Sequence, residues 1–378
     1  MRVLLLDEGF ASGALTAIGL HAAGCDVDVV AAIGGRASCA ATDGKWSFAP
    51  RVNSGSFEDV VERLRRDARY DVVYPTTEPL QQFLWTRASG WPALVLPTED
   101  AQRPAPFADK PSMSELAEAS GVDVPDQIDG VSAANIDETI RELGLPIVIK
   151  GAVGRGGQTT FIASSAAEAR DALRRIEKRG TRAFAQQYID GRTFLVGGVF
   201  HRGTPLRLYA GEKRIQFPRR IGPAAVLLSC HEDGLLQSAT RVFGAARLTG
   251  IASADFIRGP DGRFYFLELN PRPWGSIGAA RDAGVDLFEP AVKLRRGESP
   301  GPRLGFAAGV RSPVVPIALA SLAAWAAGDA WRALATASLA VASGRISPGL
   351  AVHLAERAIR VAWNWNRSPD RDPSLRSR

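Results

Sequence analysis

The chain is poor in cysteine and histidine, with three cysteines and four histidines among its 378 residues. Cys25, Cys39 and Cys230 lie far apart and form no CxxC pair, which argues against a zinc site or a disulfide framework. The histidines are isolated from one another in the sequence, so we assign none of them a catalytic role. This usage fits a reducing compartment, and we expect a cytoplasmic protein.

Long apolar runs are also missing. The opening MRVLLLDEGF meets an acid after a short apolar stretch, which predicts a first β-strand and not a signal peptide. Residues 313–328 are almost wholly apolar, but they contain Pro316 and run into Asp329. They are therefore shorter than the roughly 20 residues that a bilayer span needs. We expect a buried or amphipathic helix there, with attachment to a membrane surface as the alternative.

No basic stretch carries the interleaved aromatic residues that base stacking requires. The net charge of +6 comes largely from arginines that are scattered along the chain. We therefore expect no nucleic-acid partner, whereas a small anionic substrate such as a nucleotide fits the charge.

Patterns of strand-like and helix-like segments divide the chain into three parts. Residues 1–105 alternate strand and helix, which indicates a parallel sheet covered by helices, and QRPAPFADKP ends this part. Residues 106–300 contain closely spaced strand-like segments, which are typical of antiparallel α+β structure. These segments are 147–150, 158–162, 183–189, 193–200, 206–210, IASADFI and RFYFLEL. Residues 301–378 are alanine-rich and predicted helical, with a loose polar tail.

The last two strands form a predicted hairpin around GPDG that carries three polar side chains on one face. A two- or four-residue loop places Asp255 opposite Phe266 and Glu268 diagonally beside Asp255. Asn270 continues the same face. Two carboxylates and an amide oxygen suit magnesium, which takes its remaining ligands from water and phosphate. A solvated polar face is the alternative, but the adjacent Phe264 and Phe266 favour a metal site.

A glycine-rich connection follows the apolar strand that ends at Lys150. The segment GAVGRGGQ has glycines at 151, 154, 156 and 157, whose backbone amides can approach phosphate oxygens. It is neither a Walker loop nor a dinucleotide-binding fingerprint. A flexible hairpin tip is the alternative interpretation.

These elements, in this order, resemble the ATP-grasp superfamily, which includes D-alanine ligase, biotin carboxylase and the large subunit of carbamoyl phosphate synthetase. The resemblance covers roughly residues 1–300. Lys110 in DKPSMSELAEASGVDVP looks like the first ATP-contacting lysine of the family, and Lys150 in PIVIKGAVGRGG looks like the second. The resemblance implies that both reach the α- and β-phosphates while Gly154, Gly156 and Gly157 close over the nucleotide.

The segment AFAQQYIDGRTF is similar to the family's adenine-binding hinge, with Gln186 at the side-chain position. The resemblance implies that the backbone of Gln187 and Ile189 bonds the base edge. The family often has a ribose-binding glutamate near the position of Thr193, which has no carboxylate here. Asp190 is the candidate substitute.

The resemblance also assigns the metal ligands and two basic groups. Asp255, Glu268 and Asn270 fall on the family's ligands for two magnesium ions, for which manganese can substitute. Arg272 in ELNPR matches an arginine that would steady the transferred phosphoryl group or acyl phosphate. Lys213 lies where related enzymes extend a basic residue to the γ-phosphate, and a solvated strand end is the alternative.

The implied architecture is an α/β N-terminal domain with a parallel sheet at 1–105, an α+β ATP-grasp domain with antiparallel sheets at 106–300, and a helical C-terminal extension at 301–378. The glycine-rich flap and nucleotide hinge would span about 147–211. The implied activity is ATP-dependent ligation of a small-molecule carboxylate to an amine or similar nucleophile. The alternatives are a kinase or carbamoyl- or carboxyl-phosphate-forming enzyme, and a non-catalytic nucleotide-binding module. The oligomeric state stays open, with a dimer as one arrangement.

Overall fold

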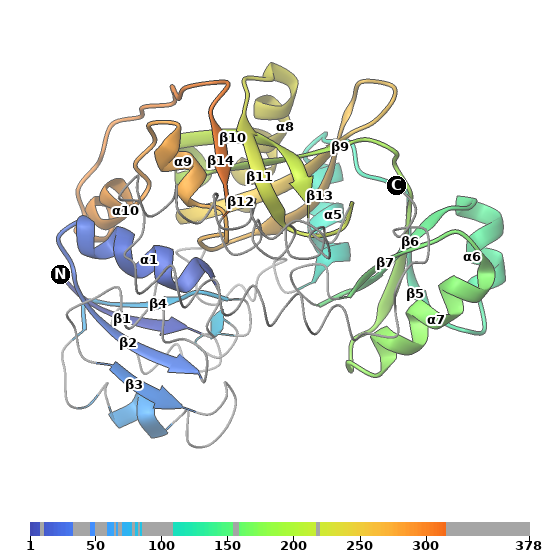
Figure 1. The fold of residues 1–378 in the computed structure, drawn as a ribbon, viewed down its shortest axis with the longest axis horizontal. Helices are drawn as coiled ribbons and strands as arrows, with labels where there is room; N and C mark the ends of the chain where they lie inside the picture. The colour runs from blue at the N-terminus through green and yellow to red at the C-terminus, as the bar shows by residue number, and fades with distance from the viewer. Residues whose placement is uncertain are drawn as a thin grey trace, which may run out of the picture.

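The computed structural model describes residues 1–7, 11–32, 46–49, 59–63, 66, 70–77, 80–81, 84, 109–153, 159–216 and 220–314. Within these residues the chain forms a four-stranded sheet A, a four-stranded sheet B and a six-stranded sheet C. In Figure 1, sheet A with α1 lies at lower left, sheet C with its helices at top centre, and sheet B with α6 and α7 at right. The expected order of a parallel sheet followed by antiparallel sheets is confirmed.

Sheet A is parallel and belongs to the N-terminal part. Its strands run in the order β3 (Trp46–Ala49), β2 (Asp26–Ala32), β1 (Arg2–Asp7) and β4 (Val72–Pro75). Helix α1 (Ala11–Ala22) connects β1 to β2, and its Leu20 packs against the apolar residues Val3 and Leu5 of β1. Parallel neighbours need such a crossover, which explains the strand–helix alternation in this part of the sequence.

Sheet B is antiparallel and has the order β5, β8, β6, β7. The strands are β5 (Gln127–Val131), β6 (Ile147–Gly151), β7 (Thr160–Ala163) and β8 (Ala183–Gln187). Helices α6 (Ile136–Leu143) and α7 (Ala166–Glu177) pack on it through apolar residues such as Ile136 and Ile176. The sequence patterns predicted β6, β7 and β8, and the structure adds β5 and both helices.

Sheet C is antiparallel and has the order β13, β12, β9, β10, β11, β14. Its strands are β9 (Arg192–His201), β10 (Thr204–Gln216), β11 (Ala224–Ser229), β12 (Gly250–Arg258), β13 (Phe264–Asn270) and β14 (Arg311–Pro313). The helices around it are α5 (Lys110–Ala119), α8 (Asp233–Ala246), α9 (Gly278–Asp282) and α10 (Phe288–Arg295).

The two faces of sheet C carry different side chains. Ala254 and Phe256 of β12 belong to a core shared with α5 and α8. Ser253 and Asp255 alternate with them and therefore lie on the opposite face, where α9 and α10 pack. On this opposite face Ser253 and Asp255 are polar, whereas Ile251 of the same strand belongs to the apolar core under α9 and α10. The candidate metal ligands therefore lie at one end of that core.

The hairpin of β12 and β13 has a different register from the one we predicted. Gly259 N donates to Arg263 O and Gly262 N to Gly259 O, so the loop has three residues and ends at Gly262, whose φ is +81°. The pairing then shifts between Asp255 and Phe256, which leaves Leu267 as a bulge. As a result Asp255 lies directly opposite Glu268, and its predicted place opposite Phe266 is wrong.

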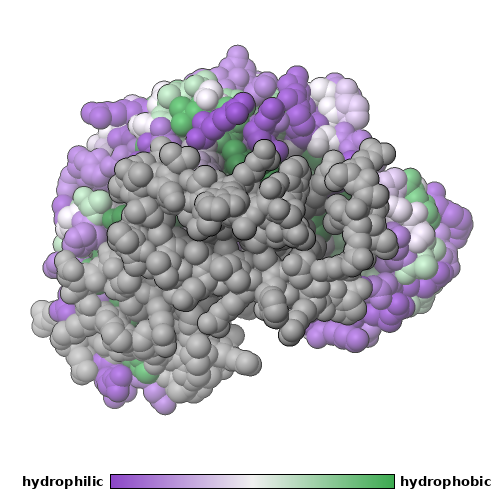
Figure 2. Space-filling model, in the orientation of Figure 1, coloured by the Kyte–Doolittle hydropathy of each residue, from purple (hydrophilic) through white to green (hydrophobic). Residues whose placement is uncertain are grey.

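The start of the predicted helical extension is extended where the structure describes it. β14 pairs with β11 at the edge of sheet C, and Val314 N donates to Ala225 O. Residues 315–378, which include most of the apolar segment, lie outside the described residues. Among the described helices, none combines the length and apolar character needed to cross a bilayer. The described part of the face in Figure 2 shows no continuous hydrophobic band.

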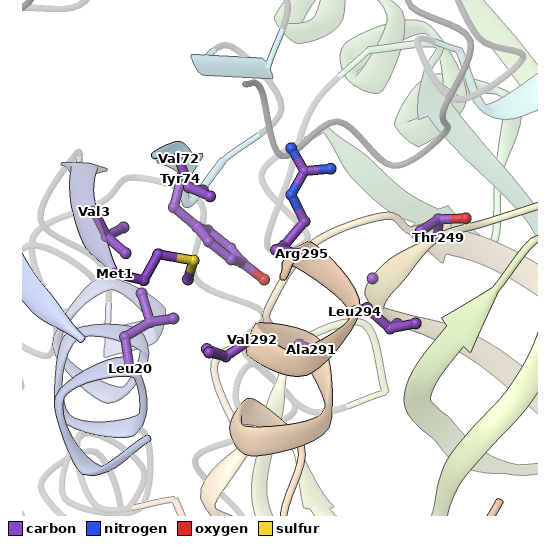
Figure 3. A pocket seen from close by; sticks show the side chains of 11 residues that line it. Met1, Val3, Leu20, Val72, Tyr74, Thr249, Ala291, Val292, Leu294 and Arg295 are labelled. Carbon is purple, nitrogen blue, oxygen red and sulfur yellow. The ribbon is translucent and has the colours of Figure 1, made fainter. Parts of the chain in front are cut away.

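A small cavity lies between sheet A and α10, with Met1, Leu20 and Tyr74 on one side and Val292 and Arg295 on the other (Figure 3). Its volume of about 20 Å³ has room for one water-sized molecule. Burial raises the pKa of the Tyr74 hydroxyl, which stays neutral there. The cavity is therefore a packing gap between the N-terminal sheet and the rest of the chain, too small for a substrate.

Two buried serines of sheet C give a matched stability prediction. Ser229 Oγ donates to Ala307 O at 2.7 Å and accepts from Val310 N at 2.8 Å, whereas Ser253 Oγ has no hydrogen-bond partner among the described residues. Ser229→Ala should lower the free energy of unfolding by about 1–3 kcal/mol, because it removes two part-buried hydrogen bonds. Ser253→Ala should change it by less than about 1 kcal/mol. Urea unfolding followed by circular dichroism measures both, and equal losses would contradict the hydrogen-bond assignment.

Candidate active site

The three predicted metal ligands lie together on one face of β12 and β13. Asp255 is 9% exposed, and its Oδ1 is buried with no hydrogen-bond partner among the described residues. Glu268 stands directly across from it, and Asn270 Nδ2 donates to Glu268 Oε1 at 3.4 Å. The structure thus brings two carboxylates and one amide to a single place. Their face is not solvated, because Ser253 and Asp255 are both buried.

Lys213 reaches this place from β10, although β9 separates β10 from β12. Its Nζ lies 2.6 Å from Asp255 Oδ2, and the two side chains are 7% and 13% exposed. A solvated strand end is therefore the wrong interpretation of Lys213. The neighbouring Arg214 belongs to another group of charges and pairs with Glu212 at 3.0 Å.

Lys150 and Gln186 lie next to each other in sheet B. Lys150 Nζ donates to Gln186 Oε1 at 2.5 Å, and Gln186 Nε2 donates to Gln127 Oε1 at 3.2 Å. Burial, opposed by the charge of Glu268 and assisted by that of Lys110, lowers the pKa of Lys150 to about 8. Lys150 is thus a buried ammonium group whose nearest partner is a neutral amide.

Three lysines converge on Glu268 from three separate elements. Burial raises the pKa of this carboxyl, but the charges of Lys110, Lys213 and Lys150 outweigh burial, so its pKa lies below the ordinary value. Burial raises the pKa of Asp255. The charge of Lys213 opposes this rise, and the charge of Glu268 adds to it. Basic groups therefore outnumber carboxylates here, and the surplus positive charge suits a polyanion.

Lys110 is held in place by the N-terminus of α5. Asp109 caps this helix by accepting from Ser112 N at 3.4 Å, and Lys110 N donates to Ala152 O at 3.0 Å. That backbone bond ties α5 to the end of β6, where the glycine-rich connection begins. Gly154, Gly156 and Gly157 lie outside the described residues, so their predicted contact with phosphate stays a prediction.

The predicted hinge residues lie at the end of β8 and directly after it. Gln187 N donates to Asp126 O at 2.8 Å, so a contact from Gln187 to a base would come from its carbonyl oxygen. Asp190 lies 3.8 Å from Arg220 and accepts from Tyr188 Oη at 3.3 Å. The candidate ribose carboxylate is therefore exposed and already has two partners. The predicted role of Ile189 stays a prediction.

Arg272 is positioned by the loop that follows β13. Its Nη2 donates to Asn270 Oδ1 at 3.0 Å, and its Nη1 donates to Pro273 O at 3.2 Å. Gln81, a buried residue of the N-terminal part, donates through Nε2 to Pro271 O at 2.6 Å. The N-terminal part thus holds the backbone next to Arg272. No local sequence signal marks Gln81, because this contact joins positions 190 residues apart.

Further polar atoms without partners lie on the same face of sheet C. Ser253 Oγ, Trp274 Nε1 and Tyr209 Oη are buried and have no hydrogen-bond partner among the described residues. Ser253 and Tyr209 both pair with Gly197, and the Trp274 ring occupies the space that a side chain at Gly197 would fill. Sequence reasoning missed these residues, which no motif marks.

No group of three or more His, Cys, Asp or Glu residues suited to a metal ion occurs in the described ranges. The two carboxylates and the amide would consequently need oxygen ligands from elsewhere to complete the coordination of a divalent ion. Magnesium sites commonly obtain these from water and nucleotide phosphates. The buried, unpartnered Oδ1 of Asp255 fits such a use, because a buried carboxylate oxygen is costly to leave unsatisfied.

Residues 107–276 match the ATP-grasp domain family. Over 206 residues the chain is 25% identical to pyruvate carboxylase of Pichia angusta. This match covers 50% of this chain but only 18% of that protein. The structure resembles the Campylobacter jejuni biotin carboxylase–β,γ-ATP complex, with a TM-score of 0.65, 18% identity and coverage of 79% of this chain and 71% of that one.

A second solved structure has a similar fold. It is the MgADP- and bicarbonate-bound biotin carboxylase domain dimer of Hydrogenobacter thermophilus 2-oxoglutarate carboxylase, with a TM-score of 0.63 and 17% identity. The match covers 79% of this chain and 70% of that chain. At such identities the likeness establishes the fold. Residues 107–276 therefore form an ATP-grasp domain.

Proposed function

We propose that the protein is an ATP-dependent ligase that joins a small carboxylic acid to an amine or similar nucleophile. The observation that carries this proposal is the pairing of the buried Asp255 with the half-buried Glu268 across the hairpin, with the charges of three lysines acting on Glu268. Two acidic ligands within a surplus of basic groups suit a nucleotide polyphosphate that arrives with divalent cations. The ATP and MgADP complexes of proteins with the same fold support this choice of ligand.

Asp255, Glu268 and Asn270 would hold two magnesium ions, with manganese as a substitute. These ions would offset the negative charge that builds up on the phosphates during transfer. Lys110 and Lys150 would bind the α- and β-phosphates, and the glycine-rich connection would cover them. Gln186, with the backbone of Gln187 and Ile189, would hold the adenine.

In the proposed reaction an oxygen of the substrate carboxylate attacks the γ-phosphorus while the bond to the β-phosphate oxygen breaks. This step yields ADP and an acyl phosphate. Lys213 and Arg272 would stabilise the transferred group, since charge stabilisation and positioning dominate such transfers. The nucleophile then attacks the acyl carbon and loses a proton, and inorganic phosphate leaves with the electron pair of the broken C–O bond.

An ADP-release screen over pooled carboxylic acids and amines, with mass spectrometry of the products, tests this function. A ligase releases ADP only when both an acid and a nucleophile are present. ADP release that needs only one substrate would indicate a kinase or an enzyme that forms carbamoyl or carboxyl phosphate. Tight nucleotide binding without turnover across the screen would indicate a binding module.

The domain limits at 105/106 and 300/301, the cytoplasmic location and a dimeric state complete the proposal. The dimer of the biotin carboxylase domain with the same fold supports the last of these. Light scattering on the purified chain measures its mass in solution directly.

The lowered pKa of Lys150 predicts proton uptake when ATP binds. In the free protein Lys150 loses its proton as the pH rises through about 8, whereas bound phosphates would hold that proton. Above pH 8 binding should therefore take up a substantial part of one proton, and ATP affinity should fall as the pH rises further. Calorimetry in two buffers of different ionisation enthalpy measures the uptake. Lys150→Arg, which stays charged, should abolish it, and unchanged uptake in this variant would refute the assignment.

A further inference from the structure

Lys213 forms an ion pair with Asp255, one of the candidate metal ligands. Its Nζ lies 2.6 Å from Asp255 Oδ2, a contact as close as that of a strong ion pair. Both side chains are largely buried, at 7% and 13% exposure, so bulk water screens the contact poorly. One oxygen of a candidate metal ligand thus already binds a cation in the free protein.

The surroundings make simultaneous binding of both cations unfavourable. Lys110 and Lys150 also act on Glu268, and Arg272 acts on Asp255. A bare divalent ion at Asp255 would lie within a few ångströms of the Lys213 ammonium group, and like charges repel strongly at such distances away from water. These basic groups already outnumber the carboxylates Asp255 and Glu268, which therefore cannot balance an added double charge.

We propose that Lys213 is a displaceable counterion that keeps divalent cations off Asp255 until a polyphosphate binds. The proposal rests on the proposed function, because the polyphosphate is the anion that releases the lysine. Phosphate oxygens give the ammonium group a new partner and supply the missing oxygen ligands of the metal. Metal and nucleotide therefore bind together, and metal alone binds weakly.

Lys150 provides a matched control. It is as buried as Lys213 and also lies near Glu268, but its Nζ donates to the neutral Gln186 and not to a carboxylate. Removing either lysine deletes one positive charge from the site. Only the removal of Lys213 frees a carboxylate oxygen, so comparing the two variants separates direct competition from general electrostatics.

The test is a Mn²⁺ titration of the nucleotide-free protein, followed by the electron paramagnetic resonance signal of free Mn²⁺. Lys213→Gln should bind Mn²⁺ at least about tenfold more tightly than the wild type, because a neutral amide replaces the competing charge. Lys150→Gln should gain less than about threefold, and its gain should shrink at high salt. Adding a non-hydrolysable ATP analogue to the wild type should raise its Mn²⁺ affinity to at least that of Lys213→Gln.

Equal gains in the two glutamine variants, or no gain in Lys213→Gln, would overturn the proposal. Lys213→Arg keeps the charge and serves as a second variant, so a gain there as large as in Lys213→Gln would also overturn it. Thermal unfolding with and without Mn²⁺ checks that each variant folds, and the stabilisation by Mn²⁺ should be largest in Lys213→Gln. None of these readouts requires turnover. A failed substrate screen with the expected Mn²⁺ pattern would therefore reject the ligase and leave the counterion role standing.

Discussion

Glu268→Gln is expected to lower the rate of ADP release by about 100-fold or more while the chain stays folded. Glu268 faces Asp255 across the hairpin and bonds Asn270 on its own strand, so it stands between the two other ligands. It is the carboxylate best placed to share its oxygens between two ions. Gln keeps the size and shape of the side chain but removes the charge that would offset two divalent cations.

Asp255→Asn is the comparison for this variant and should lose less activity. Asp255 would serve one ion, so higher magnesium concentrations should partly restore turnover. ADP release measured against magnesium concentration for both variants gives the result, with circular dichroism as the control for folding. Near-normal activity in folded Glu268→Gln would remove the basis of the metal-site assignment.

Lys150→Ala and Lys213→Ala are expected to separate nucleotide binding from turnover. Lys150 lies beside Gln186, the proposed adenine contact, and near the proposed metal ligand Glu268, so it would contact the phosphates of bound ATP before any reaction. Its loss should raise the Kd for ATP by about 10- to 100-fold, which is the range for a charge-assisted contact. Lys213 lies at Asp255, where the γ-phosphate would meet the metal ions. Its loss should lower kcat by about 100-fold and change the Kd for ATP by less than about threefold, because the lost phosphate contact and the easier binding of the metal ion act in opposite directions.

Calorimetric ATP binding and steady-state ADP release, measured on both variants, test this division of roles. Lys178→Ala offers a control, because Lys178 follows α7 and is a surface residue of sheet B's helical layer. Similar losses of ATP affinity in the Lys150 and Lys213 variants would contradict the division. A normal Kd for Lys150→Ala would show that the lysine stabilises the fold and takes no part in binding.

Much of the candidate site could be predicted because its parts are local in sequence. Asp255 and Glu268 are joined by one hairpin, and alternation along a strand is enough to place Asn270 on the same face as Glu268. The register of the β12–β13 hairpin could not be predicted from the sequence in the same way. Its three-residue loop depends on Gly262 at positive φ, and its bulge at Leu267 depends on packing of Phe266 and Leu269 into the core.

The sequence by itself determined the order of the sheets, the hairpin that carries the carboxylates, and the positions of Lys110 and Lys150. These features follow from periodicity, turn residues and strand ends, which are properties of short segments. Only the tertiary structure decided that Lys213 reaches Asp255 across β9, that Lys150 pairs with Gln186, and that Gln81 holds the backbone next to Arg272. Each of these contacts joins distant segments, and the packing of whole sheets and domains sets such distances.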